Sequence, residues 1–400
     1  MNPNIQKLVT IANKRKKRII GLMSGTSLDG LDIALCSLEG TGTETRAELE
    51  YFETFSYADE VKEEIREVFA KKDIKLEKLC LLHPWIALLH ARYIRECLSK
   101  WNIDRSEIDL IASHGQTIYH APMFFHQHKK FGNATLQIGD GDHLAVATGI
   151  ITISDFRQKH IAAGGEGAPL ALYGDYLLFS KKGEERILLN IGGIANFTYL
   201  PADTNTNEII CTDTGPGNTL MDAYVRKQFR GKYFDEDAAL AIRGKVIDAL
   251  LTALKENDFF DQPFPKTTGP ELFNMAFLEK AIQKAGLPLA SDEDILATLN
   301  KFTADCIVDA IKKNGLNKPA LHIYCSGGGL HNPLLMQQVK DQLPGCIFHS
   351  TAMLGIAPDA KEAVLFAALA NELICGDPAV FGEGRIGMPP VSMGKISFPG

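Results

Sequence analysis

Alternation of apolar runs with polar, glycine-bearing turns predicts strands followed by helices in the first half of the chain. Residues 18–38 read as two strands joined by a tight turn, and residues 51–57 supply a third strand. Apolar residues then recur at helical spacing over 59–71, and a helical pattern interrupted at Pro84 covers 76–100. Short apolar strands follow at residues 110–113 and 149–154.

The second half repeats this plan. Residues 186–200 again read as strand, glycine turn and strand. A helix is expected near Thr219, with Asn218 as its N-cap. Helices dominate 238–314, and a buried strand covers 320–325. Similar hairpins opening each half indicate a duplicated α/β architecture.

The repeat also suggests where one domain ends and the next begins. A length of 400 residues exceeds the size at which a single core usually keeps growing. We expect an N-terminal domain of residues 1–157 plus 376–400 and a C-terminal domain of residues 158–375.

Composition narrows the class of protein. Hydrophobic residues make up 45% of the chain and charged residues 23%, as in ordinary globular proteins. No apolar run approaches the roughly 18 to 20 residues that cross a bilayer. The eight cysteines form no C-x-x-C pair, which favours reduced thiols. We therefore expect a cytoplasmic protein that does not enter a membrane.

The basic run at residues 14–18 is the one feature that suggests nucleic acid. The formal net charge is −7, and no second basic patch supports such binding. We expect a solvated basic leader ahead of the first strand and no nucleic-acid partner.

The turn after the first strand carries the strongest chemical signal. Gly25 and Gly30 permit positive φ angles and close approach of a ligand. Thr26 and Ser27 offer hydroxyl groups, and Asp29 offers a carboxylate for a hydrated cation. Such a turn can hold nucleotide phosphates, but it can equally be a surface hairpin closed by its glycines.

Three glycine turns together define the nucleotide hypothesis, since the chain has no G-x-x-x-x-G-K-[ST] motif. Their order is hairpin, hairpin, then strand, glycine loop and helix. This order resembles the sugar kinase, Hsp70 and actin superfamily. The resemblance implies a two-domain actin-like ATPase fold, made of duplicated ribonuclease H-like domains with an interdomain active-site cleft.

Longer motifs narrow the resemblance within that superfamily. They are Gly21-Leu-Met-Ser-Gly-Thr-Ser-Leu-Asp-Gly30, Ser113-His-Gly-Gln-Thr117, Asp155-Phe-Arg157, Gly164-Gly-Glu-Gly-Ala-Pro-Leu170, Asn190-Ile-Gly-Gly193, Asp213-Thr-Gly-Pro-Gly-Asn218, Lys266-Thr-Thr-Gly269, Ser326-Gly-Gly-Gly329 and Gly382-Glu-Gly-Arg-Ile-Gly-Met-Pro-Pro. Together they resemble the anhydro-N-acetylmuramic acid kinase family from about residue 18 to the C-terminus. One departure is Glu166, where the family more often has Gln.

The resemblance implies a reaction of cell-wall recycling. Water opens the 1,6-anhydro bridge of anhydro-N-acetylmuramic acid while O6 takes the γ-phosphate of ATP, giving N-acetylmuramic acid 6-phosphate. Asp213 would be the catalytic base that takes a proton from this water. The alternative is a loop aspartate that binds its own backbone before a helix.

The resemblance also assigns binding residues. For ATP it implies Gly25, Thr26, Ser27, Leu28, Asp29, Gly30, Leu31, Asp32, Asn190, Gly192, Gly193, Lys266, Gly327, Gly328, Gly329 and Asn332, with Mg²⁺ at Asp29. For the sugar it implies His114, Gln116, Thr117, Arg157, Gly164, Gly165 and Glu362. Arg157 would pair with the lactyl carboxylate, because guanidinium and carboxylate match geometrically.

Two other functions remain open. A kinase for another anhydro sugar, of the levoglucosan type, would keep the hairpins and Asp213 but bind no lactyl group. A nucleotide-gated scaffold of the actin or Hsp70 type would hold ATP without a small substrate.

The resemblance to the family also implies that the protein is a homodimer. The histidines around His126 and His128 lack the ligand set of a zinc site.

Overall fold

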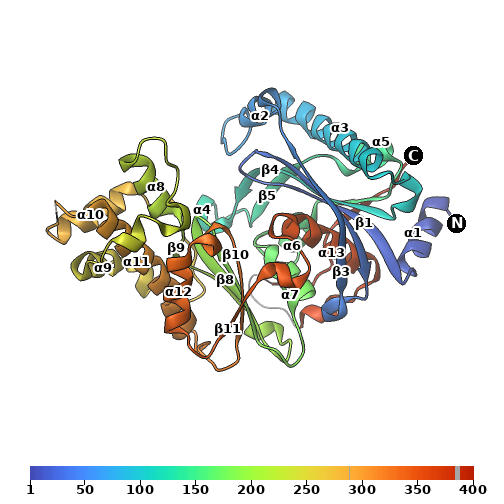
Figure 1. Cartoon of the computed structure of the whole chain (residues 1–400). Helices are drawn as coiled ribbons and strands as arrows, with labels where there is room; N and C mark the ends of the chain where they lie inside the picture. Colours follow the sequence, from blue (N-terminus) through green and yellow to red (C-terminus); the bar gives the residue numbers. More distant parts are fainter. Residues whose placement is uncertain (288, 383–387) are drawn as a thin grey trace. The chain divides into compact units, whose positions relative to one another are not determined.

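The computed structural model describes residues 1–287, 289–382 and 388–400. They form two compact units (Figure 1). Unit 1 comprises Met1–Ser180, Asn205–Asn207 and Gly355–Gly400. Unit 2 comprises Lys181–Thr204 and Glu208–Leu354. Among the described residues, no helix is both long and apolar enough to span a bilayer.

Unit 1 is built on a seven-stranded mixed sheet whose central path runs β12-β6-β4-β1-β2-β3, with β5 paired to β4. Strands β1 to β3 are antiparallel, whereas β4 and β6 run parallel to β1 and β4 respectively. Strand β1 is buried along most of its length, as expected for a central strand covered on both faces. The strands are β1 (Lys16–Ser24), β2 (Gly30–Glu39), β3 (Arg46–Ser56), β4 (Leu110–Ala121), β5 (Ala134–Ile138), β6 (Thr152–Ser154) and β12 (Lys395–Ser397).

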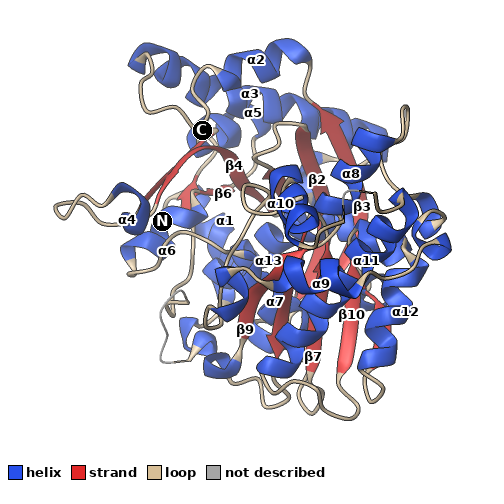
Figure 2. Ribbon diagram, turned by 90° about the vertical axis from the view of Figure 1, so that its left-hand side faces the viewer, coloured by secondary structure: helices blue, strands red, loops and turns tan. Residues whose placement is uncertain are grey.

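Helices cover both faces of this sheet (Figure 2). Ile20 and Leu22 join one core with residues of α3, whereas Gly21 faces the opposite way and packs on α13. A Cβ atom at Gly21 would overlap the carbonyl oxygen of Ala363, so glycine permits this close packing. The helices are α1 (Pro3–Ala12), α2 (Asp59–Arg66), α3 (Leu76–Trp101), α4 (Met123–His126), α5 (Gly141–Thr148), α6 (Phe156–Ala162), α7 (Ala171–Phe179) and α13 (Lys361–Cys375).

Unit 2 has a five-stranded sheet with the order β11-β10-β7-β8-β9. Strands β7, β8 and β9 are antiparallel, and β10 and β11 continue parallel to β7. The elements are β7 (Arg186–Ile191), β8 (Ile194–Leu200), β9 (Ile210–Pro216), β10 (His322–Ser326), β11 (Ile347–Ser350), α8 (Thr219–Gln228), α9 (Asp248–Lys255), α10 (Met275–Lys284), α11 (Asp292–Lys313) and α12 (Pro333–Gln342).

The two sheets share one plan. The path β6-β4-β1-β2-β3 of unit 1 has the same order and strand directions as β11-β10-β7-β8-β9 of unit 2. Each unit therefore opens with an antiparallel hairpin whose first strand lies at the centre of the sheet. The predicted α/β duplication is confirmed.

The observed unit boundaries differ from the expected ones. The first unit extends to Ser180 rather than residue 157, and the chain returns to it at Gly355 rather than residue 376. The reason is packing: α7 and α13 contact one another, and α13 also lies on β1 of unit 1. Periodicity along the chain identifies these helices but does not show which sheet they cover.

Two local expectations are wrong. Pro84 lies inside α3 without ending it, since buried residues on both sides, such as Leu82 and Ile86, pack into one core. Asn218 does not cap α8 through its side chain. Its Nδ2 instead donates to the carbonyl of Ile191 over 3.3 Å.

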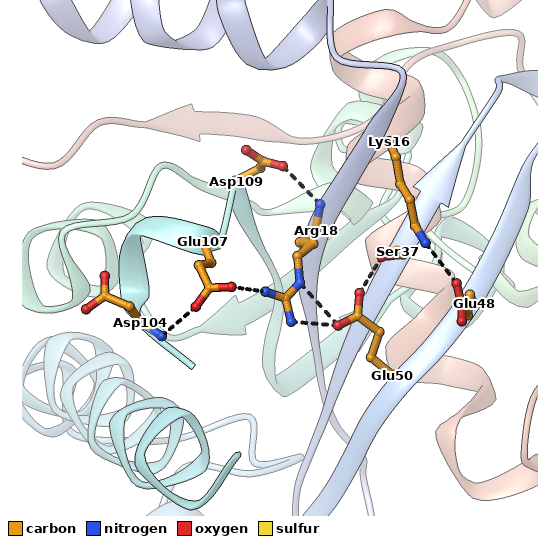
Figure 3. Close-up of polar contacts among 8 residues, drawn as sticks. All are labelled: Lys16, Arg18, Ser37, Glu48, Glu50, Asp104, Glu107 and Asp109. Carbon is orange, nitrogen blue, oxygen red and sulfur yellow. Dashed lines mark hydrogen bonds and ion pairs between the residues drawn. The ribbon is translucent and has the colours of Figure 1, made fainter. Parts of the chain in front are cut away.

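The basic run is solvated only in part: Lys14, Arg15 and Lys16 are exposed, but its second half forms the start of β1 rather than a leader ahead of it. Arg18 donates to Glu50 and Glu107, and its backbone N–H donates to Asp109 over 2.9 Å (Figure 3). Lys16 pairs with Glu48 over 2.9 Å. These carboxylates neutralise the run and attach it to the sheet.

Candidate active site

The first glycine turn presents its polar side chains outward. Thr26, Ser27 and Asp29 are exposed between β1 and β2, while Leu28 is only 4% exposed. Leu28 adopts a φ of 57°, which places the turn in the left-handed region at a non-glycine residue. The backbone N–H of Tyr57 donates to the carbonyl of Asp29 over 2.9 Å and ties the turn to the end of β3. The turn is thus fixed to the end of β3 through its backbone, while its polar side chains are exposed to solvent.

A buried chain of hydrogen bonds lies behind this turn. The Ser24 hydroxyl donates to Gln116 Oε1 over 2.6 Å and lies 2.9 Å from the Tyr57 hydroxyl. Tyr57 in turn lies 2.8 Å from His90 Nε2. Burial lowers the pKa of His90 to about 3, so this imidazole is neutral and fits a purely hydrogen-bonded chain. Tyr57 and His90 were missed because no local motif marks them.

Gln116 belongs to this chain and does not face a ligand. Its side chain is 0% exposed, and its amide donates to the carbonyl of Gly25 over 3.1 Å. The direct contact of Gln116 with the sugar stays a prediction, which this burial disfavours. Its burial makes it a support for the first hairpin.

Unit 1 contains a cavity of about 350 Å³ at the hairpin. It brings together residues far apart in sequence that were predicted separately for the phosphates and for the sugar. The lining residues are Met23, Ser24, Gly25, Thr26, Ser27, His114, Thr117, Arg157 and Glu362. Residues predicted to bind phosphate and residues predicted to bind sugar therefore line the same cavity of unit 1.

Arg157 is held rigidly in this cavity. Its Nε donates to His114 Nε2 over 2.8 Å, and its Nη1 donates to the carbonyl of Gly167 over 2.7 Å. Burial lowers the pKa of Arg157 to about 10, partly offset by the charge of Glu362, so the guanidinium stays protonated at neutral pH. Burial lowers the pKa of His114 to about 3, with Arg157 adding to the effect. A neutral His114 can therefore accept the Arg157 hydrogen bond.

The other predicted sugar residues divide into two groups. Burial raises the pKa of Glu362, and the positive charge of Arg157 partly offsets that rise. This carboxyl group lines the cavity and can form hydrogen bonds there. Gly164 and Gly165 do not line the cavity. Gly165 packs on the His160 ring, and its carbonyl accepts from Asn133 over 3.1 Å.

In unit 2 the second glycine turn docks onto the start of α8. The backbone N–H of Gly217 donates to Gly193 O, and that of Asn218 donates to Gly192 O, each over 2.8 Å. A Cβ atom at Gly217 would overlap Gly192 O, so only glycine permits this approach.

The third glycine loop meets the second at the end of β7. Gly327 has a φ of 84°, and a Cβ atom there would overlap the carbonyl of Ile191. Ser326 Oγ lies 3.4 Å from Asn190 Oδ1. Asn332 instead caps α12 by accepting from the Leu335 N–H over 2.9 Å. The structure therefore gathers Asn190, Gly192, Gly193 and the loop 327–329 at one edge of the unit 2 sheet.

Asp213 lies half-buried on β9. The backbone N–H of Thr268 donates to its Oδ2 over 2.8 Å. Burial raises the pKa of Asp213, the Thr268 hydrogen bond opposes that rise, and the charge of Glu271 adds to it. A carboxylate with a raised pKa is a stronger base, as proton abstraction from water requires.

Lys266 lies close to Asp213 in the same unit. Its side chain is 8% exposed, and its Nζ donates to the carbonyl of Phe259 over 2.8 Å. The rings of Phe259 and Phe264 have their centres 4.3 and 4.6 Å from Nζ. This enclosure contradicts the expectation of an ammonium free to reach a phosphate.

The residues at the first hairpin fit a hydrated divalent cation. Burial raises the pKa of Asp32, and the charges of Asp29 and Asp359 add to the rise despite a hydrogen bond from Thr54. Three carboxylates therefore contribute negative potential here. Among the described residues, no group of three or more His, Cys, Asp or Glu forms a metal cage. Mg²⁺ commonly uses one or two carboxylates, with waters and phosphates completing its shell.

Two α/β units of equal strand order, each with a glycine hairpin at the equivalent strand pair, are the features expected of the sugar kinase, Hsp70 and actin class. The model of the family "Anhydro-N-acetylmuramic acid kinase" matches residues 17–399, and the chain belongs to this family.

Relatives of the same name cover the full chain. The chain is 54% identical over 400 residues to the anhydro-N-acetylmuramic acid kinase of Pseudoalteromonas atlantica, covering 100% of both chains. It is 40% identical over 396 residues to that of Caldanaerobacter subterraneus, covering 98% of this chain and 100% of the relative.

Solved structures give more distant similarities. The activator of the 2-hydroxyisocaproyl-CoA dehydratase from Clostridium difficile, with bound ADPNP, matches 89% of this chain and 95% of its own, at 13% identity and a TM-score of 0.38. Hexokinase from Schistosoma mansoni, complexed with glucose, matches 88% of this chain and 85% of its own, at 11% identity and a TM-score of 0.33.

Proposed function

We propose that the protein is an ATP-dependent kinase that opens 1,6-anhydro-N-acetylmuramic acid with water and phosphorylates O6, yielding N-acetylmuramic acid 6-phosphate in cell-wall recycling. The observation that carries this proposal is Asp213, a half-buried carboxylate with a raised pKa, positioned by a backbone N–H and lying within the residues that the family model matches. Such a group suits the removal of a proton from water near neutral pH.

The reaction balances as follows. The oxygen of water bonds to C1 while the bond between C1 and O6 breaks, and O6 bonds to the γ-phosphorus of ATP as ADP leaves. The proton of the attacking water passes to Asp213. The proposed reaction needs residues of both units, and a shared active site stays a prediction.

We assign the phosphate contacts to backbone N–H groups of the two hairpins, at residues 25–32 and 190–193. The third loop, residues 327–329, is proposed to receive the adenosine. Asp29, supported by the negative potential of Asp32 and Asp359, would hold Mg²⁺ through water. When bound, Mg²⁺ neutralises charge on the phosphate oxygens.

We assign the sugar to the cavity of unit 1. Arg157 is proposed to pair with the lactyl carboxylate. One side-chain acceptor, His114 Nε2, and one backbone acceptor, Gly167 O, already orient its guanidinium. Thr117 and Glu362 line the same cavity and can bind hydroxyl groups. His114 orients Arg157, and the loop at Gly164 and Gly165 stays a predicted backbone contact.

Product analysis in ¹⁸O-labelled water tests the reaction class. With ATP and anhydro-N-acetylmuramic acid, we expect label at C1 and phosphate at O6 in the same product. Phosphorylation with an intact anhydro bridge would contradict the proposal. ATP consumption that does not depend on the sugar would instead favour a nucleotide-gated scaffold.

The substrate assignment is tested by Arg157→Ala. We expect kcat/KM for anhydro-N-acetylmuramic acid to fall about 100-fold, because a bidentate charged contact is lost. Residual turnover of levoglucosan, which has no lactyl group, should change much less. If turnover of the acidic sugar is unchanged, the assignment of Arg157 is wrong.

A homodimer in the cytoplasm completes the proposal. Sedimentation equilibrium of the purified protein would test the dimer, and a monomeric mass across the micromolar range would contradict it.

A further inference from the structure

The segment that follows η6 (Asp258–Asp261) runs beside the strand that carries Asp213, and the two are joined by four hydrogen bonds. The carbonyl of Lys266 accepts from the Asp213 N–H over 2.9 Å and from the Thr212 hydroxyl over 3.2 Å. The Lys266 N–H donates to the Thr212 hydroxyl oxygen over 3.0 Å. The fourth bond is the one from Thr268 N–H to the Asp213 carboxylate. The position of this segment therefore sets that of the carboxylate.

The side chain of Lys266 holds the segment from the other side. Its ammonium donates to Phe259 O and lies among the rings of Phe259, Phe260 and Phe264, with centres 4.3 to 5.7 Å away. An ammonium over aromatic faces is attracted by their quadrupoles, more strongly when it is removed from water. Lys266 thus links η6 and the segment 264–268 into one rigid piece.

We infer that Lys266 is a positioning residue for Asp213: its caged ammonium fixes the backbone that aims the Thr268 N–H at the carboxylate. The inference rests on the proposed function for its kinetic consequence, but not for its structural one. Burial lowers the pKa of Lys266, with the charge of Lys313 adding to the effect, which agrees with an ammonium taken out of water.

The first test is Lys266→Met, which keeps the length of the side chain and removes the charge and the donor. Methionine packs favourably on aromatic rings and the only hydrogen bond lost is the one to Phe259 O, so we expect a folded variant. With the cage broken, the Thr268 N–H moves away, and the pKa of Asp213 rises by about one unit. A ¹³C titration of labelled aspartate carboxyls, with Asp213 identified by its loss in Asp213→Asn, measures this without substrate.

The kinetic readout is a fall in kcat of about 10- to 100-fold, with the acid limb of its pH profile displaced upward. The KM values for ATP and the sugar should stay within about twofold of wild type, since no ground-state contact is removed. Lys266→Arg should restore most of kcat, because the adjoining cavity of about 180 Å³ admits the longer side chain and the guanidinium also stacks on aromatic rings.

Lys313→Met is the matched control. Lys313 lines the same cavity and donates to Phe260 O over 3.2 Å, but it lies on α11 rather than in the segment that is hydrogen-bonded to Asp213. We expect wild-type titration and kcat. An unchanged Asp213 titration in Lys266→Met would overturn the inference, as would a raised KM for ATP with no change in titration. If wild-type protein fails to turn over the sugar, the proposed function fails, while the titration still decides the role of Lys266.

Discussion

At the scale of single residues, the main feature is the carboxylate of Asp213, whose burial disfavours its charged form. The raised pKa of Asp213 means that the folded protein disfavours the ionised form. Such a group costs stability that is recovered only when it is protonated, as is common where function requires a strained arrangement. Replacement of the Asp213 carboxylate by a neutral group should therefore lower activity and raise stability.

The variant Asp213→Asn tests both responses. We expect kcat to fall by about 10² to 10⁴, the usual contribution of a positioned base. At pH 7 the melting temperature should rise, because the buried charge is gone. The sign follows from linkage: as pH falls through the raised pKa toward the ordinary aspartate value of 3.8, wild type also becomes neutral, so its stability deficit shrinks as the solution becomes more acidic.

Calorimetry at pH 7 and pH 5 with Asp222→Asn as control makes this specific. Burial likewise raises the pKa of Asp222, on α8 of the same unit, so this variant should reproduce the stability effect while leaving kcat near wild type. A full loss of kcat in Asp222→Asn, or none in Asp213→Asn, would refute the assignment of the base.

At the scale of elements, the first hairpin depends on a buried polar chain that joins its own strand β1 to β4, to α3 and to the residue that follows β3. Ser24 lies on β1, Gln116 on β4 and His90 on α3, while Tyr57 follows β3 and joins the chain to the turn. Buried polar networks are rigid when every member is satisfied and costly when one is removed. The geometry of the hairpin therefore depends on Tyr57, His90 and Gln116, which lie behind the turn and do not line the cavity.

Tyr57→Phe removes one hydroxyl from this chain. We expect a loss of about 1–3 kcal/mol in the free energy of unfolding, because buried partners lose their hydrogen bond. The KM for ATP should rise as the hairpin loosens. Denaturant unfolding and steady-state kinetics measure both effects.

Tyr93→Phe is the control for this variant. Tyr93 is buried and stacks on Phe55 at 4.5 Å, and the substitution keeps that packing. A stability loss equal to that of Tyr57→Phe would show that the chain behind the hairpin has no special role.

At the scale of the whole molecule, each unit has a core of its own. Ile20 belongs to a cluster confined to unit 1, and Leu189 belongs to one confined to unit 2. Contiguous cores of this kind commonly open as separate cooperative units.

Hydrogen exchange on a matched pair of core variants tests this separation. We expect Leu189→Ala, at about 2–5 kcal/mol of local destabilisation, to speed amide exchange mainly in β7, β8 and β10. Ile20→Ala should do the same mainly in β1, β2 and β4. Equal acceleration in both units by either variant would show that the molecule opens as one cooperative body.

Much of the fold and part of the site could be predicted from sequence. The hairpins were predictable because a glycine turn between two apolar runs is a local signal, and their repetition indicated the duplication. Asp213 and Arg157 were proposed from motifs that resemble the family, and their roles stay predictions. The burial of Gln116 and the place of Tyr57 in the hydrogen-bonded chain were not predicted, since a chain that joins residues 24, 57, 90 and 116 leaves no pattern in any short window.

The chain by itself determined the strands, the glycine turns, the family and the chemical type of each candidate group, because these follow from periodicity, backbone freedom and side-chain chemistry. Tertiary structure alone decided where α7 and α13 pack, which polar groups are buried, and that Lys266 is caged among phenylalanines. Those outcomes arise from contacts between distant segments, and it is such contacts that set burial, protonation and orientation.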